Sequence, residues 1–147
     1  MAEVIDRDLG WKDIMHGFRK LNDKTIKAGV LEGAGSEANG ASIAEVATYN
    51  EYGTRRIPSR PFIAIATDES KGWQGEVKKQ ISGFKSSADI DGALSSIGEQ
   101  MKKDIKGVIG NKSKLARNAP STIARKGHDY PLIDTWKLFE AIDYEVK

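Results

Sequence analysis

The chain contains no cysteine and only two histidines among its 147 residues. Without cysteine it can form no disulfide bond, thiolate nucleophile or common structural zinc site, so packing must stabilise the fold. No apolar run approaches the roughly 18 residues that a membrane-spanning helix requires, and the opening MAEVIDRDLGW lacks the apolar core of a signal peptide. We therefore expect a protein that folds in the cytosol and does not associate with membranes.

An excess of charge of one sign is also missing. The 23 Lys and Arg residues nearly balance the 21 Asp and Glu residues, which leaves a net charge of +2. General nucleic-acid-binding domains carry a strong basic excess on one face, so any contact with a polyanion must be local here. The length and the 39% hydrophobic content predict one folded domain, residues 1–147.

Apolar residues at three- and four-residue spacing predict several helices. In chain order they cover residues 9–26, 43–52, 62–82, 89–108, 120–125 and 132–142. Asp8 is the expected N-cap of the first helix, and Ser42 with Glu45 has the spacing of a capping box. The most regular apolar stripe consists of Ile90, Leu94, Ile97, Met101, Ile105 and Val108.

Two segments have the composition of strands, residues 27–32 and 143–147, and a glycine-rich loop follows the first of them at 33–40. The sequence therefore offers two candidate strands among several helices. Because an isolated pair of strands is marginally stable, either a hairpin lies within residues 33–40 or other copies of the chain complete the sheet. The second possibility indicates an oligomer.

The sequence offers little for catalysis or cofactor binding. His16 and His128 have no second histidine nearby, and the glycines of residues 29–40 match no phosphate-binding loop. Asp129 beside His128 could orient a general base, but combinations of this kind with a nearby hydroxyl arise by chance, and no nucleophile elbow is present. We expect no enzymatic activity, no cofactor and no metal.

Basic residues gather in two acid-free, loop-like segments. The first contains Arg55, Arg56 and Arg60, and the second contains Lys112, Lys114, Arg117, Arg125 and Lys126. Both segments could be solvated loops without a specific role. Alternatively, they contact an acidic protein surface or a phosphate backbone.

Three stretches of the chain resemble a known family. They are IAEVATYNEYGT, then IPSRPFIAIA, and much later KGHDYPLIDTWKLFEAIDYEV. Together they are similar to the small neck proteins of tailed phages that are described as virion morphogenesis, head-tail joining or tail completion proteins. Members of that family share the patterns A-x-x-N-E-[FY]-G-T, [IM]-P-x-R-P-F and P-L-[IV]-D-T-G-x-L-x-x-S-I. The resemblance covers about residues 27–147.

The match can be followed residue by residue. The residues that fit the three patterns are Asn50, Glu51, Tyr52, Gly53 and Thr54, then Ile57, Pro58, Arg60, Pro61 and Phe62, and finally Pro131, Leu132, Ile133, Asp134, Thr135 and Leu138. Trp136 stands where the family usually has glycine, and Ala141 stands where it usually has serine. A tryptophan at this position adds apolar surface that must find a pocket or a partner.

The resemblance implies an α+β fold, in which a small, mainly antiparallel sheet packs against several helices. It also implies a structural subunit that assembles into a closed ring, expected to be a hexamer, at the head-tail junction or the upper end of the tail. Its partners would be other phage neck or tail proteins, not a specific nucleic-acid sequence. It would reside in the virion and, during assembly, in the host cytoplasm. The alternative is a cytoplasmic nucleic-acid-binding or regulatory module that uses the basic region 112–126.

The first basic loop then has an expected role. Pro58 and Pro61 restrict the backbone on both sides of Arg60, which predicts one loop shape without backbone hydrogen bonds. Phe62 would anchor the loop to the core, and the three arginines would contact a neighbouring subunit or ring. A rigid loop loses little entropy when it docks.

Overall fold

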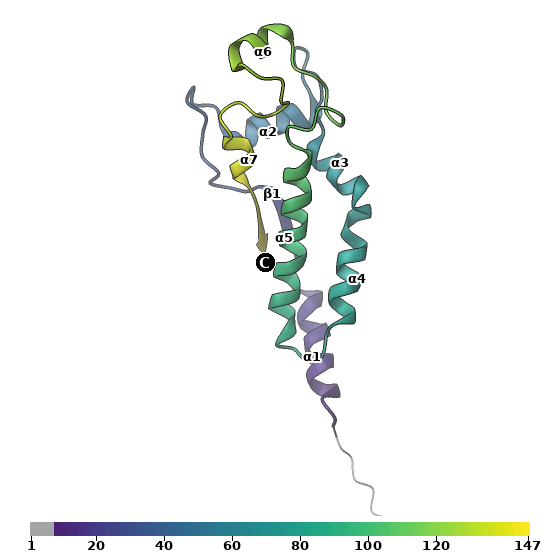
Figure 1. Cartoon of the computed structure of the whole chain (residues 1–147). Coiled ribbons are helices and arrows are strands. Elements are labelled where there is room, and N and C mark those ends of the chain that lie inside the picture. Colours follow the sequence, from purple (N-terminus) through teal and green to yellow (C-terminus); the bar gives the residue numbers. More distant parts are fainter. Residues whose placement is uncertain (1–7) are drawn as a thin grey trace, which may run out of the picture.

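The computed structural model describes residues 8–147, which form seven α-helices, one 3-10 turn and a two-stranded antiparallel sheet (Figure 1). This architecture confirms the predicted α+β class. The helices are α1 (Trp11–Asn22), α2 (Ile43–Tyr52), α3 (Phe62–Glu69), α4 (Gln74–Ser82), α5 (Asp89–Val108), α6 (Pro120–Lys126) and α7 (Lys137–Ala141). The strands are β1 (Ile26–Val30) and β2 (Ile142–Val146), and the 3-10 turn η1 spans Lys71–Trp73.

Helix α5 is the central element, with α3 and α4 along one side and the sheet along another (Figure 1). Its bounds agree with the prediction, and its apolar stripe is buried except for Met101, which is half-buried. Burial of each large aliphatic side chain contributes about 1.5–3 kcal/mol. Gly98 lets the helix approach the sheet, because a β-carbon there would overlap the ring of Tyr144.

The two strands pair in antiparallel register from Ile26 opposite Val146 to Val30 opposite Ile142. Strand β1 therefore begins at Ile26, and the predicted helix over residues 9–26 was too long. Within the described residues, the loop 33–40 forms only an isolated bridge between Ser36 and Ser42, not a hairpin. The sheet contains no third strand from residues 8–147, and α5 packs against both of its strands.

The predicted helix over residues 62–82 is interrupted between α3 and α4. Lys71, Gly72 and Trp73 all have a positive φ, of 51°, 64° and 58°. This conformation turns Trp73 into the interior, where its Nε1 donates a hydrogen bond to Asp104 Oδ2 at 2.8 Å. A contact 31 residues away thus overrides the local helical pattern.

The predicted helix over residues 132–142 shortens to α7. Leu132 and Trp136 both have φ of 66°, a left-handed conformation that ends regular helix geometry. Trp136 is the N-cap residue of α7. Glycine adopts this conformation at little cost, whereas a residue with a side chain seldom does. The chain retains this turn although a tryptophan occupies it.

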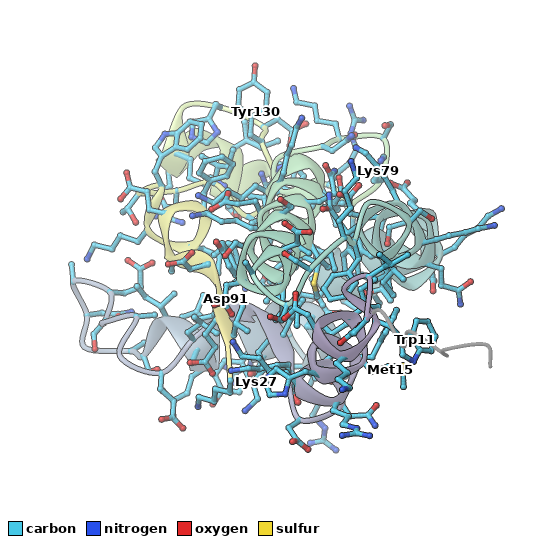
Figure 2. The ribbon with its side chains drawn as sticks, turned by 90° about the horizontal axis from the view of Figure 1, so that it is seen from below. Trp11, Met15, Lys27, Lys79, Asp91 and Tyr130 are labelled. Atoms are coloured by element: carbon cyan, nitrogen blue, oxygen red, sulfur yellow. The ribbon has the colours of Figure 1, made fainter. Side chains whose placement is uncertain are left out.

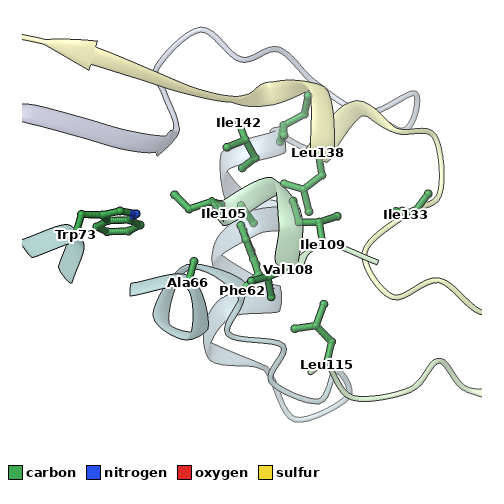
Figure 3. Close-up of a cluster of buried hydrophobic side chains, with 12 residues drawn as sticks. Phe62, Ala66, Trp73, Ile105, Val108, Ile109, Leu115, Ile133, Leu138 and Ile142 are labelled. Atoms are coloured by element: carbon green, nitrogen blue, oxygen red, sulfur yellow. The ribbon is translucent and has the colours of Figure 1, made fainter. Parts of the chain in front are cut away.

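The largest hydrophobic cluster lies where α3, α5, α7 and β2 meet (Figure 3). Phe62, Ile105 and Ile142 are almost completely buried in it. Leu115 and Ile133 extend the same cluster toward the segments on either side of α6. Consequently, the core directly supports the loops that carry the basic residues.

Helix α1 lies at the end of the molecule opposite α6 (Figure 1). Gly17 is buried against the ring of Phe84, and the Phe18 and Phe84 rings lie 5.2 Å apart. Asp8 Oδ1 accepts a hydrogen bond from the Lys12 amide at 3.2 Å, whereas Gly10 occupies the N-cap position that was predicted for Asp8. Among the helices of the described residues, none has the length and apolar character needed to cross a membrane.

Candidate functional site

The arginine loop between α2 and α3, residues 53–61, is closed by backbone hydrogen bonds. The Arg60 amide donates to the Asn50 carbonyl at 2.6 Å, and the Thr54 amide donates to the Ile57 carbonyl at 2.8 Å. The expectation that this loop would lack backbone hydrogen bonds was therefore wrong. Gly53 has φ of 75°, and a β-carbon there would lie 2.9 Å from the Ser59 nitrogen, so glycine suits this position.

The glutamate of the first motif holds the second motif in place. The Glu51 carboxylate accepts hydrogen bonds from the Ile63 and Ala64 amides at 3.0 and 2.9 Å, at the N-terminus of α3. Pro61, with φ −78° and ψ 69°, forms an inverse γ-turn that places the Phe62 amide 2.8 Å from the Arg60 carbonyl. The two motifs therefore fold as one unit, with Pro61 just before α3 rather than within its first turn.

Arg60 is buried and is only 8% exposed. Its Nε and Nη2 donate to the Ala116 and Arg117 carbonyls, both at 2.8 Å, and burial lowers the pKa of its guanidinium group from the ordinary value. The prediction that Arg60 contacts a partner was wrong, because the side chain joins the two basic segments within the molecule. Phe62 anchors the loop in the core, as expected, and its complete burial excludes it from a partner surface.

Arg55 and Arg56, in contrast, are exposed at the tip of the loop. Within residues 8–147 neither arginine forms an ion pair. Thr54 Oγ1 accepts hydrogen bonds from the Arg56 and Ile57 amides at 3.2 and 3.1 Å, which fixes the backbone beneath these two side chains. Tyr52, which is 80% exposed, precedes them at the end of α2.

The second basic segment is largely engaged by the chain itself. Three of its cations pair with acids: Lys114 with Glu69, Arg117 Nε with Asp129 Oδ2 at 3.8 Å, and Arg125 Nη1 with Asp134 Oδ2 at 2.9 Å. The other two contact Tyr130. Lys112 Nζ lies 4.8 Å from the centre of its ring, and Lys126 Nζ donates a hydrogen bond to its backbone carbonyl at 3.0 Å. The segment has no acid of its own, but the fold brings acids to it. Its positive field is correspondingly weaker than the sequence indicated.

A groove of about 660 Å³ runs between the 33–40 loop, α2, α6 and α7. Arg60, Lys126 and Trp136 line it, together with the buried side-chain amide of Asn118, whose nitrogen has no hydrogen-bond partner within the described residues. Burial lowers the pKa of Lys126, and the nearby Arg125 and Arg60 lower it further, although Asp134 opposes them. Cations are therefore crowded at this end of the molecule.

Trp136 is 51% exposed and packs edge-on against Phe139, with the ring centres 5.4 Å apart. Its position at the rim of the groove is compatible with the predicted contact to a partner. Glu51 and Asn118 were not predicted as residues of this site. Their contacts depend on how separate segments meet, although the glutamate two positions before the glycine of the first motif was a usable signal.

The groups considered for catalysis are not assembled into a metal site. Within residues 8–147 no cluster of three or more His, Asp or Glu side chains could hold a metal ion. His128 Nδ1 accepts a hydrogen bond from the Tyr130 amide at 3.3 Å, and His16 is exposed on α1. This end of the molecule presents two exposed guanidinium groups on a hydrogen-bonded loop, and a groove beside them.

No protein-family model, curated protein or solved structure matches the chain. The motifs and the contacts among them therefore carry the functional argument.

Proposed function

We propose that this chain is a ring-forming structural protein of a tailed phage, which acts at the head-tail junction as a connector or at the upper end of the tail as a completion protein. The observation that carries the proposal is the mutual support of the motif residues. Glu51 of the first motif caps the N-terminus of α3, the helix that starts in the second motif. Gly53 permits the close turn between the two motifs, and Arg60 hydrogen-bonds both motifs to the segment before α6. This support favours a single inherited unit over a chance match.

The exposed pair Arg55 and Arg56 is suited to binding an acidic protein surface. Their loop is held by backbone hydrogen bonds, so docking would cost little backbone entropy. Adjacent guanidinium groups give orientation and specificity against carboxylates. The partner would be an acidic rim of a neighbouring phage protein.

Binding to nucleic acid through residues 112–126 is the weaker alternative. Phosphate groups would compete with Glu69, Asp129 and Asp134, which already pair with the cations of this segment. Affinity for a phosphate backbone depends on the number of cations that neutralise phosphates. The internal pairs lower that number, and a protein partner is favoured for this reason.

The test is to delete the gene from the phage that encodes it and to complement the deletion with variants. The wild-type chain should restore the phage titre, whereas the double variant Arg55→Ser, Arg56→Ser should not. The matched control is Lys78→Ser, Lys79→Ser, which removes two exposed adjacent cations from α4 and should restore the titre. Full complementation by the arginine variant would contradict the proposed contact, provided that all three proteins melt at similar temperatures.

A further inference from the structure

An apolar cavity of about 290 Å³ lies between α1, α4 and α5, far from the arginine loop. Its lining includes Leu21, Trp73, Ile81, Ile90, Leu94 and Ile97. Lys24 and Gln80 are its polar lining residues among the described part of the chain. Protein interiors leave few voids larger than a water molecule, so an apolar cavity of this size favours an occupant.

The same chain exposes an apolar group of suitable size at the beginning of α1. Leu9 is 90% exposed and Trp11 is 66% exposed. Trp11 lies at the periphery of the molecule beside α1 (Figure 2). Large exposed apolar side chains that lie together mark interaction surfaces, and tryptophan contributes the most area per residue.

Trp11 cannot fill the cavity of its own molecule. Leu21, which lines the cavity, follows Trp11 by ten positions on the same helix. At 1.5 Å per residue the helix holds these two positions about 15 Å apart along its axis. Trp11 therefore does not reach the part of its own cavity that Leu21 lines, whereas the Trp11 of another molecule can enter it.

We propose that Trp11 of one copy inserts into the α1–α4–α5 cavity of a second copy. Gln80 lines the cavity, and its Nε2 donates a hydrogen bond to Glu76 Oε1 at 2.7 Å. The side-chain oxygen of Gln80, Oε1, is therefore left to accept a hydrogen bond from the indole N–H. Lys24, which also lines the cavity, has the opposite charge to Asp8, which precedes Trp11 in the inserting copy. The apolar fit, the indole acceptor and the charge complementarity all favour a second copy as the occupant.

The contact joins two different surfaces, so each subunit would have one inserting end and one receiving end. Repetition of a contact of this kind closes into a ring when the rotation permits. The inference deepens the ring assembly proposed above, and only the closure of the ring rests on that proposed function. The contact itself can be tested on the purified chain.

Two variants separate the inserting end from the receiving end. Trp11→Ala removes the inserting group, and Ala93→Phe fills the cavity from α5, because Ala93 lines it. Tyr49→Ala is the matched control, since it removes a half-exposed aromatic side chain from α2, at the other end of the molecule (Figure 1). We expect the wild type and the control to self-associate in sedimentation experiments between about 1 μM and 1 mM. Each of the other two variants alone should be monomeric, with an unchanged or raised melting temperature for Ala93→Phe.

Mixing these two variants gives the decisive result. Trp11→Ala retains the cavity and Ala93→Phe retains the tryptophan, so together they should form a 1:1 dimer that grows no further. A mixture that stays monomeric would overturn the inference, as would self-association of Trp11→Ala at the wild-type level or a wild-type chain that is monomeric throughout. None of these outcomes would contradict the neck function, which the phage experiment tests separately.

Discussion

Replacement of Arg60 by alanine should destabilise the protein, whereas replacement of Arg55 by alanine should not. Arg60 is the buried arginine of the loop. Its two hydrogen bonds reach the carbonyls of Ala116 and Arg117, which follow it by 56 and 57 positions in the sequence. Arg55 has no ion-pair partner within residues 8–147. The two variants remove the same charge, so they separate a structural effect from a change in net charge.

The magnitude follows from the two hydrogen bonds. A hydrogen bond with one charged partner contributes about 1.5–3 kcal/mol to stability. Ala116 and Arg117 are exposed, so their carbonyls can regain water when the guanidinium group is lost, and the lower end of the range applies. We therefore expect Arg60→Ala to lower the free energy of unfolding by about 3 kcal/mol, and Arg55→Ala to change it by less than about 0.5 kcal/mol.

Urea unfolding of the two variants and the wild type measures this difference directly. A loss of about 3 kcal/mol also corresponds to a melting temperature lower by roughly 10 °C for a chain of this length. Arg60→Lys keeps the charge but loses the planar fork that reaches both carbonyls, and it should lie between the wild type and Arg60→Ala. Equal unfolding free energies for Arg60→Ala and Arg55→Ala would contradict the structural role of Arg60.

Two further predictions concern the contact between α5 and the sheet. Gly98→Ala should lower the unfolding free energy by about 1–3 kcal/mol, since the new β-carbon would overlap the Tyr144 ring. The control is Gly107→Ala in the same helix, whose β-carbon would meet no atom within 4 Å and which should stabilise the protein by up to about 1 kcal/mol. A Gly98→Ala protein as stable as the wild type would be incompatible with this packing. The hydrogen bond from Lys102 at 3.0 Å, followed by that from the Tyr144 amide, lowers the pKa of Asp143. Its contribution to stability is therefore present above about pH 4, the ordinary aspartate value, and is lost as the pH falls through the depressed value. In the Asp143→Asn variant, the unfolding free energy should therefore fall less steeply as the pH is lowered below about 4. An unchanged pH dependence in that range would contradict the stabilising role of the Lys102–Asp143 pair.

Local sequence pattern predicted the elements that depend on it. The bounds of α5 and its buried stripe follow from regular apolar spacing, and the capping box of Ser42 and Glu45 is confirmed, with Glu45 Oε2 accepting from the Ser42 amide at 3.4 Å. The pairing of β1 with β2 could not be read from the chain, because the two strands lie more than 100 residues apart in sequence. The predicted helix over residues 62–82 is interrupted at Trp73, where a tertiary contact to Asp104 replaces the next helical turn.

The candidate site was predictable in its composition but not in the role of each residue. The acid-free arginine segment was correctly located, and Arg55 and Arg56 are exposed as expected. Arg60 has the same local composition, yet its carbonyl partners come from the other basic segment. Burial of an arginine requires acceptors that only the folded chain brings together. For the same reason, the acids that pair with Lys114, Arg117 and Arg125 were not anticipated.

The most direct test of the proposed neck function is electron microscopy of a lysate from the phage with this gene deleted. The proposal predicts DNA-filled heads and separate tails that have not joined. Tails of abnormal length would place the protein on the tail side, and tails of normal length would place it on the head side. Joined, infectious particles in normal numbers would contradict the neck function.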